Sequence, residues 1–259
     1  MKDNRFKRVL AEGRIPVGHM IMEFGTRGLA MMAKAADLDF VLLDMEHTGF
    51  DMERMADLTA FFKATDVAPF VRVPQPVYHF MARLMDAGVL GIMVGNVETA
   101  EVAKSIVDAV KYAPLGKRGL GLGTAHNDYV APDIRYLRTA NENTTIICQI
   151  ESPLGLENCE AIAQVEGVDN LWVGHFDLSN AMGIPAQFEN PRFIEALEHV
   201  VRVARKYGKT AGIQPGDEQQ AERWIGLGFN VISWKADIAL YRGALQKEVR
   251  WLRGKLQNA

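Results

Sequence analysis

Ionisable side chains follow an apolar run in the segment FVLLDMEHTGF at residues 40–50. Asp44, Glu46 and His47 lie within a few positions of one another there. A histidine can move protons near neutral pH, and its value as a base rises when a carboxylate orients it. A lone histidine at a strand end is also often structural, so His47 is only a candidate base. Asp86, in MDAGVLGIMV, is a candidate partner that would reach His47 across the molecule.

A second pair of carboxylates lies one strand–helix unit apart, with Glu151 in CQIES and Asp177 in VGHFDLS. Two carboxylates on neighbouring strands either repel, so that one is protonated, or share a cation. Mg²⁺ takes carboxylate oxygens and keeps positions open for water and substrate, such as the ketone and carboxylate oxygens of a 2-oxo acid. The alternative is a pair of solvated or helix-capping side chains, and Asp177 before LSN suits an N-cap.

Arg72 lies inside an apolar run, in PFVRV. Because arginine is almost never fully buried without a partner, two interpretations are open. Arg72 forms a structural ion pair, or it points into an open site and holds an anion or oxyanion. Gln149 shares its run with Glu151 and is a further polar candidate.

Most of these residues end or follow short apolar runs, which alternate with segments of helical period such as TAEVAKSIVDAVKYA. The runs occupy residues 16–21, 39–43, 68–73, 89–94, 144–150, 170–174, 210–213 and 230–234. Eight strand–helix units predict an α/β fold, a (β/α)8 TIM barrel formed by residues 1–259 as one domain. A doubly wound sheet is the rival, but GHMIMEFGTRG lacks the expected GxGxxG turn. The site is then expected on the loops after the strands.

The composition is that of an ordinary globular protein, with 48% hydrophobic and 24% charged residues. A formal net charge of -3 gives no sign of a nucleic-acid or membrane partner. No run approaches the roughly 18 apolar residues of a membrane span, and the N-terminus reads as a short amphipathic helix, so a cytoplasmic protein is expected. Cys148 and Cys159 lack metal or CxxC spacing and are expected to be reduced and buried.

An ordered set of motifs resembles one known family. FVLLDMEHTGFD, PFVRVP, LMDAGVLGIMV, YAPLGKRGLG, ICQIESPLGLEN and VEGVDNLWVGHFDLSNAMG resemble, in this order, the HpcH/HpaI aldolases. These are metal-dependent pyruvate aldolases similar to 4-hydroxy-2-oxoheptanedioate aldolase and 2-dehydro-3-deoxyglucarate aldolase. The resemblance covers residues 15 to 245 approximately. It implies a barrel whose last helix packs on a neighbouring subunit, in a hexamer built as a trimer of dimers.

The resemblance also implies reversible cleavage of a 4-hydroxy-2-oxo acid to pyruvate and an aldehyde through an enolate, with a place in aromatic-compound catabolism. A divalent metal, Mg²⁺ first and Mn²⁺, Co²⁺ or Zn²⁺ as options, would be held by Glu151 and Asp177. Arg72 would contact the enolate oxygen, and His47 paired with Asp86 would transfer protons. The remaining implied positions are Asp44 behind the metal and water network and, around the substrate, Gln149, Gly174, Phe176, Asp177 and Gln214.

Some positions depart from the family pattern. Residues 174–177 read Gly-His-Phe-Asp where Gly-Pro-Ala-Asp is common, so His175 and Phe176 flank the carboxylate pocket. Gly95 stands where proline is frequent, and the long stretch 115–133 has GLGTAHND where a serine and an arginine are expected near the site. These changes leave the acceptor aldehyde open, with Gln214 or His126 favouring a polar one. Glu46 has the weakest claim in its segment and is expected to be structural.

Other functions remain open. Lys235, in VISWKAD, would form a Schiff base in a metal-independent aldolase. A citrate-lyase-like enzyme would need basic residues for coenzyme A phosphates, for which Lys117 and Arg118 are the candidates. Oxaloacetate decarboxylation or macrophomate-synthase-like coupling would use the same metal and Arg72. A catalytically dead scaffold barrel would lack site residues, yet every position carried over from the family is present.

Overall fold

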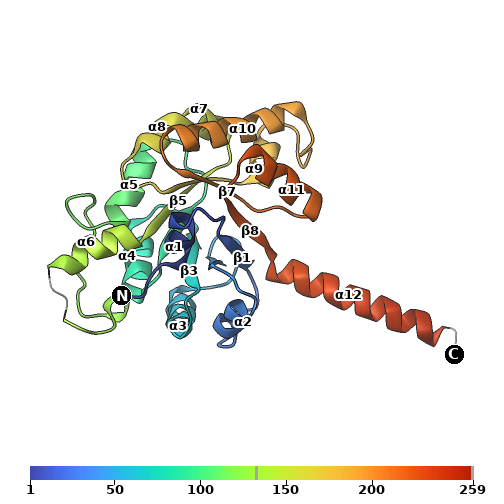
Figure 1. The fold of residues 1–259 in the computed structure, drawn as a ribbon, viewed down its shortest axis with the longest axis horizontal. Coiled ribbons are helices and arrows are strands. Elements are labelled where there is room, and N and C mark those ends of the chain that lie inside the picture. Colours follow the sequence, from blue (N-terminus) through green and yellow to red (C-terminus); the bar gives the residue numbers. More distant parts are fainter. Residues whose placement is uncertain (132–133, 258–259) are drawn as a thin grey trace.

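Eight parallel strands close into a barrel surrounded by helices (Figure 1). The computed structural model describes residues 1–131 and 134–257. The strands are β1 Val17–Ile21, β2 Phe40–Asp44, β3 Ala68–Val73, β4 Gly91–Val94, β5 Thr145–Ile150, β6 Asn170–Val173, β7 Thr210–Ile213 and β8 Val231–Ala236. The helices are α1 Arg5–Ala11, α2 Leu29–Ala35, α3 Met52–Phe62, α4 Tyr78–Ala87, α5 Ala100–Val110, η1 Ala125–Asn127, α6 Arg135–Asn143, α7 Pro153–Glu157, α8 Cys159–Gln164, α9 His175–Ala181, α10 Pro191–Lys206, α11 Glu218–Leu227 and α12 Asp237–Leu256.

The predicted (β/α)8 barrel is confirmed, because each of the eight apolar runs forms a strand and β1 pairs with β8 to close the sheet. Strand bounds differ from the prediction mainly at two ends. β4 begins at Gly91, two residues late, and β8 continues to Ala236, which pairs with Met20 of β1. Cys148 and Cys159 are free and buried, as expected. Within the described ranges, no helix is long and apolar enough to cross a membrane.

Aromatic side chains fill the barrel interior where a neighbouring strand carries glycine. A Cβ on Gly18 would lie 2.3 Å from the Phe40 ring, and one on Gly91 would lie 2.6 Å from the Phe70 ring. Phe6 of α1 closes the amino-terminal end of the barrel, with its ring centroid 5.3 Å from that of Phe40 and 5.0 Å from that of Phe70. The amino-terminal half of the barrel is therefore packed with hydrophobic side chains. The polar groups lie at the carboxyl ends of the strands.

The long stretch predicted to lie near the site runs instead along the amino-terminal end of the barrel; its residues 132–133 are outside the described part of the chain. Lys63, directly after α3, donates to the carbonyl of Ala125 and lies 2.6 Å from the Asp128 carboxylate. The amino group of Met1 lies 3.2 Å from the same carboxylate. Helices run opposite to strands in a barrel, so the end of α3 marks the face opposite to the strands' carboxyl ends.

Helix α12 leaves the barrel and projects as a long rod (Figure 1, red). Its first residue, Asp237, is buried and anchors it. The Asp237 carboxylate accepts hydrogen bonds from the backbone N–H groups of Met22, Glu23 and Phe24 at 3.0, 3.0 and 2.8 Å. The charge of Asp237 thus ties the segment after β1 to the start of α12.

We expect Asp237→Asn to lower the free energy of unfolding by about 1–3 kcal/mol, because an amide NH₂ would face backbone N–H groups that need an acceptor. Urea denaturation of both proteins measures the difference. Asp57→Asn, at an exposed position on α3, is the matched control and should change stability little. Equal stability of Asp237→Asn and the wild type would contradict the anchoring role.

Candidate active site

Arg72 projects from β3 into the mouth of the barrel and is only 7% exposed. Its Nε and Nη2 donate to the two carboxylate oxygens of Asp44, both at 2.8 Å, and its Nη1 lies 3.1 Å from Glu46. Burial opposes the charge of Arg72, yet the Asp44 hydrogen bonds and the charges of Asp44, Glu46 and Glu151 raise its pKa above the ordinary value. The ion-pair interpretation of Arg72 is therefore confirmed, and its role in holding an anion stays a prediction.

Asp44, fully buried at the end of β2, also folds the segment that follows it. It accepts from the backbone N–H of Glu46 at 3.0 Å and of His47 at 3.4 Å, and its own carbonyl accepts from the Thr48 hydroxyl. These hydrogen bonds agree with the expectation that Asp44 supports the residues of the site from behind. One carboxylate thus orients Arg72 and sets the turn that carries Glu46 and His47.

Glu151 follows β5 and is 8% exposed. Its Oε1 accepts from the backbone N–H of Asn96 at 2.5 Å, and its Oε2 accepts from the side-chain amide of Gln149. Burial, with smaller contributions from the charges of Glu46 and Asp177, raises the pKa of Glu151 to about 7. The Gln149 Oε1 is buried and has no partner among the described residues. Glu151 thus has two hydrogen-bond donors but no ion pair with a cation among the described residues.

Two glycines let the backbone come close to Glu151. A Cβ on Gly174 would lie 2.1 Å from Glu151 Oε2, and one on Gly95 would lie 3.0 Å from Oε1 and 2.9 Å from Glu46 Oε1. Gly95 and Gly174 follow β4 and β6, the strands on either side of β5. The glycine predicted to permit close approach at position 174 is therefore needed by the carboxylate itself.

Asp177 and Phe176 lie in the first turn of α9, and both are exposed. The first backbone N–H groups of a helix have no partner inside it, so those of residues 176 and 177 can serve a substrate carboxylate. His175 turns the other way, and its ring packs on Phe188 and Trp224 with centroid distances of 5.2 and 5.4 Å. Burial lowers the pKa of His175 to about 4, which leaves it neutral near pH 7.

The side chains at this mouth fit a hard divalent cation. The carboxylates of Asp44, Glu46 and Glu151 act on the guanidinium of Arg72, and the charges of Glu46 and Asp177 act on Glu151. Over the described ranges, no three His, Cys, Asp or Glu side chains form a ready-made cage. A set of two carboxylate ligands with the rest supplied by water and substrate is how Mg²⁺ is usually bound.

His47 and Asp86 lie at opposite ends of the barrel within one chain. His47 follows β2 at the carboxyl end, its side chain is 57% exposed, and its Nε2 lies 3.8 Å from Glu46. Asp86 is in the last turn of α4 and lies 2.5 Å from Arg118. Both residues are described, and no ion pair joins them. His126 is near Asp86 too, bonded to Tyr136 and Gly121, so it does not face Glu151 and Asp177 of the same chain.

A cavity of about 580 Å³ opens beside Phe176. Gln214, just after β7, and Lys235, near the end of β8, line it together with the first turns of α12. The Gln214 Oε1 has no partner among the described residues. The structure thus brings the two residues that sequence analysis linked to the aldehyde and to a rival chemistry into one cavity.

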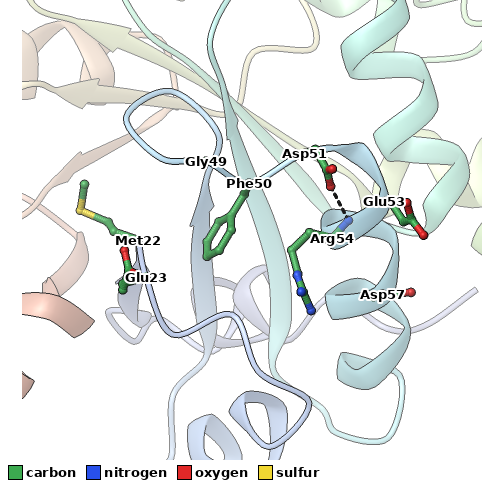
Figure 2. A pocket seen from close by; sticks show the side chains of 8 residues that line it. All are labelled: Met22, Glu23, Gly49, Phe50, Asp51, Glu53, Arg54 and Asp57. Atoms are coloured by element: carbon green, nitrogen blue, oxygen red, sulfur yellow. Dashed lines mark hydrogen bonds between the residues drawn. The ribbon is translucent and has the colours of Figure 1, made fainter.

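Another cavity, of about 530 Å³, lies between the segment after β1 and the start of α3 (Figure 2). Phe50 lies between its two sides, and Asp51 caps α3 by accepting from the Arg54 backbone N–H at 2.9 Å. Its lining residues are Met22, Glu23, Gly49, Phe50, Asp51, Glu53, Arg54 and Asp57. With four carboxylates to one arginine, this cavity disfavours an anionic substrate.

Two further residues belong to this geometry. Glu46, expected to be structural, lies between Arg72 and Glu151. Asn96 was missed because its contribution is a backbone N–H, and φ of +48° at Asn96 turns that part of the chain.

The comparisons with known proteins agree with this geometry. The family model HpcH/HpaI aldolase/citrate lyase matches residues 26–244. The chain belongs to this family. Among HpcH/HpaI proteins, a 5-keto-4-deoxy-D-glucarate aldolase of Klebsiella pneumoniae is 33% identical over 248 residues, 94% of either chain. That relative is named for a sugar acid, not for an aromatic compound.

Solved structures of similar proteins have the same barrel. A crystal structure of an HpcH/HpaI aldolase from Desulfitobacterium hafniense has a TM-score of 0.91 at 29% identity, and the match covers 95% of this chain and 96% of that one. The citrate synthase SbnG has a TM-score of 0.88 at 26% identity, with 97% and 98% covered. The resemblance read from the motifs is therefore confirmed.

We expect Gly174→Ala to lower the free energy of unfolding by about 1–3 kcal/mol, because its Cβ would overlap the Glu151 carboxylate and the Gln149 amide. Urea denaturation measures the loss. Gly226→Ala in α11, where a Cβ meets nothing within 4 Å, is the control and should be neutral or stabilising. If both variants behave alike, the close approach at position 174 carries no cost and the packing argument fails.

Proposed function

We propose that this protein is a divalent-metal-dependent aldolase that reversibly cleaves a 4-hydroxy-2-oxo acid to pyruvate and an aldehyde. One observation supports this most: a buried Glu151 lies beside Asp177 and Glu46 and within the field of Arg72 at the barrel mouth. Family membership supports the same chemistry. Mg²⁺ is the first candidate ion, and Mn²⁺, Co²⁺ or Zn²⁺ are the alternatives.

Each residue has a task in this scheme. Glu151 and Asp177 would hold the ion, which when bound supplies positive charge to the oxygen of the pyruvate enolate. Arg72 uses three N–H groups on Asp44 and Glu46, so two of its five donors are left for that oxygen.

Substrate binding and proton transfer fall to the surrounding groups. The backbone N–H groups of Phe176 and Asp177 would bind the substrate carboxylate beside Gly174, and Gln149 would steady Glu151. His47 would take the proton of the 4-hydroxyl group, since its ring is exposed at the mouth.

The relative's name favours a sugar-acid substrate for this chain. 5-Keto-4-deoxy-D-glucarate has a carboxylate at each end, so the aldehyde released from it is polar and anionic. The polar Gln214 in the cavity beside Phe176 fits such an aldehyde. We therefore place the protein in sugar-acid breakdown and not in aromatic catabolism.

The structure gives little support to an acyl-CoA substrate, because Lys117 and Arg118, the predicted phosphate-binding residues, already form ion pairs. Lys117 lies 2.8 Å from Asp108, and Arg118 lies 2.5 Å from Asp86, so carboxylates already neutralise both. Oxaloacetate decarboxylation needs only the Arg72 site and remains the second candidate.

We expect pyruvate release from 4-hydroxy-2-oxo acids to vanish with EDTA, to return with Mg²⁺ or Mn²⁺, and to fall at least ~100-fold in Glu151→Gln, because an amide binds a hard cation poorly. A lactate-dehydrogenase assay follows pyruvate, with oxaloacetate tested in parallel. Glu157→Gln, at an exposed position on α7, is the control. Activity that is indifferent to EDTA would overturn the metal proposal, and activity with oxaloacetate alone would favour the second candidate.

We also propose that the protein is a homo-oligomer, a trimer of dimers, in which α12 packs on a neighbouring copy. Leu245, Trp251 and Leu252 of α12 are about half exposed. The outer face of β1 and the neighbouring α2, which an eighth helix would cover, exposes Val17 and Met32. Both surfaces are apolar and lack a partner within the described chain, as an exchanged helix requires.

The assembly would also reconcile His47 with Asp86. Because the two residues lie at opposite ends of one barrel, they can pair only between copies. We expect His47→Ala and Asp86→Ala to be inactive alone and to recover about a quarter of the sites when the unfolded variants are refolded together. The control is a mixture of the two variants after each has folded separately, in which subunits do not exchange and no activity should appear. No recovery from a mixture that light scattering shows to be oligomeric would overturn the pairing.

A further inference from the structure

Strand β8 contains a bulge at its carboxyl end. Along β1, Gly18 pairs with Ser233 and Met20 pairs with Ala236, so β8 has one residue more than its partner between these two pairs. The backbone of Lys235 in this bulge has φ of +57°, a left-handed conformation that favours glycine. A bulge re-aims a side chain, and bulges are common next to active sites.

Lys235 lines the 580 Å³ cavity beside Phe176. Of the described residues that line this cavity, Lys235 is the one lysine, arginine, aspartate or glutamate. No carboxylate of the described chain lies within ion-pair distance of its Nζ. The Nζ lies 4.8 Å from the centroid of the Trp234 ring, a cation–π contact that stabilises the ammonium form. The cavity therefore holds one unneutralised positive charge.

Gln214 adds a second polar group to the same cavity, on the neighbouring strand end. The Oε1 of Gln214 has no hydrogen-bond partner within the described chain. It can accept a hydrogen bond from a ligand hydroxyl group once the ligand enters the cavity or the Gln214 side chain rotates slightly. Phe176 joins this cavity to the first turn of α9, where the other end of the substrate is proposed to bind. The ammonium of Lys235 and the amide of Gln214 would lie beyond the carbon–carbon bond that is cleaved. Together they suit an aldehyde that carries a hydroxyl group and ends in an anion.

We propose that Lys235 binds the terminal carboxylate of the acceptor aldehyde and so makes this enzyme selective for anionic hydroxy-aldehydes, with Gln214 contacting the adjacent hydroxyl. This assignment rests on the proposed aldolase function. It gives Lys235 a role in recognition and not in Schiff-base formation. The bulge in β8 is then the device that points a lysine at the far end of the substrate.

The test compares two acceptors that differ only at that end, tartronate semialdehyde with a carboxylate and glyceraldehyde with a hydroxymethyl group. In aldol addition with pyruvate, we expect the wild type to prefer tartronate semialdehyde. Lys235→Gln should lower the ratio of the two kcat/KM values roughly 10–100-fold, the range expected for a lost hydrogen bond to a charged group. Lys34→Gln, an exposed position on α2, should leave the ratio as it is.

Two further variants separate recognition from folding. Lys235→Arg should keep most of the preference because it keeps the charge. Lys235→Gly should lose the preference while melting no lower than the wild type, because glycine adopts the positive φ without strain. Exchange of the pyruvate methyl protons in D₂O, which needs no acceptor, should persist in Lys235→Gln; its loss would indicate a Schiff base and overturn the assignment.

The outcomes also separate this assignment from the aldolase proposal. If the wild type adds pyruvate to neither aldehyde, the aldolase proposal falls and the assignment of Lys235 falls with it. If the wild type is active and Lys235→Gln lowers both acceptors equally or lowers neither, only the assignment of Lys235 is overturned.

Discussion

The site depends on a guanidinium held inside the mouth of the barrel. Removing a charge from water is costly unless the charge is paired and its donors are satisfied. Asp44 does both for Arg72 with two parallel hydrogen bonds, and it can do so because β2 and β3 are neighbours and residue 44 pairs with residue 72 in register. The same carboxylate holds the backbone of Glu46 and His47. One buried carboxylate thus fixes the positions of Arg72, Glu46 and His47.

That ion pair leaves an excess of negative charge around Glu151. A chain selected only for stability would not bury a second carboxylate beside Glu46 and supply it with one amide and one backbone N–H. Glu151 can occupy this position because residues 95 and 174 are glycines, whose missing Cβ atoms leave room for its carboxylate. Conflicts of this kind between local stability and placement are typical of functional sites. The proposed cation would resolve the conflict, because it would interact favourably with each carboxylate and remove the reason for Glu151 to bind a proton.

The sequence was sufficient for the barrel and for the residues at strand ends. Apolar runs of strand length, spaced by helical segments, leave few folds, and residues after successive strands must meet at one end. It was insufficient for Asp86 and the stretch 115–133, because proximity was argued from family motifs and not from the direction of the chain. Asp86 ends a helix, and helices return the chain to the opposite end. His175 was equally hidden, since its aromatic neighbours Phe188 and Trp224 come from distant segments.

The two halves of the mouth are built on different principles. Arg72 lies in a regular strand and Glu151 directly follows one, and both are held by hydrogen bonds. Such fixed positions suit the pyruvate unit of the proposed reaction. Around Lys235 the chain is irregular: a bulge, a left-handed lysine and the start of a helix that leaves the barrel. A left-handed L-residue costs roughly 1–2 kcal/mol, and such strain persists only where the surrounding structure enforces it. Conserving the regular half while varying the irregular half would let one barrel keep its bond-breaking chemistry and change its aldehyde.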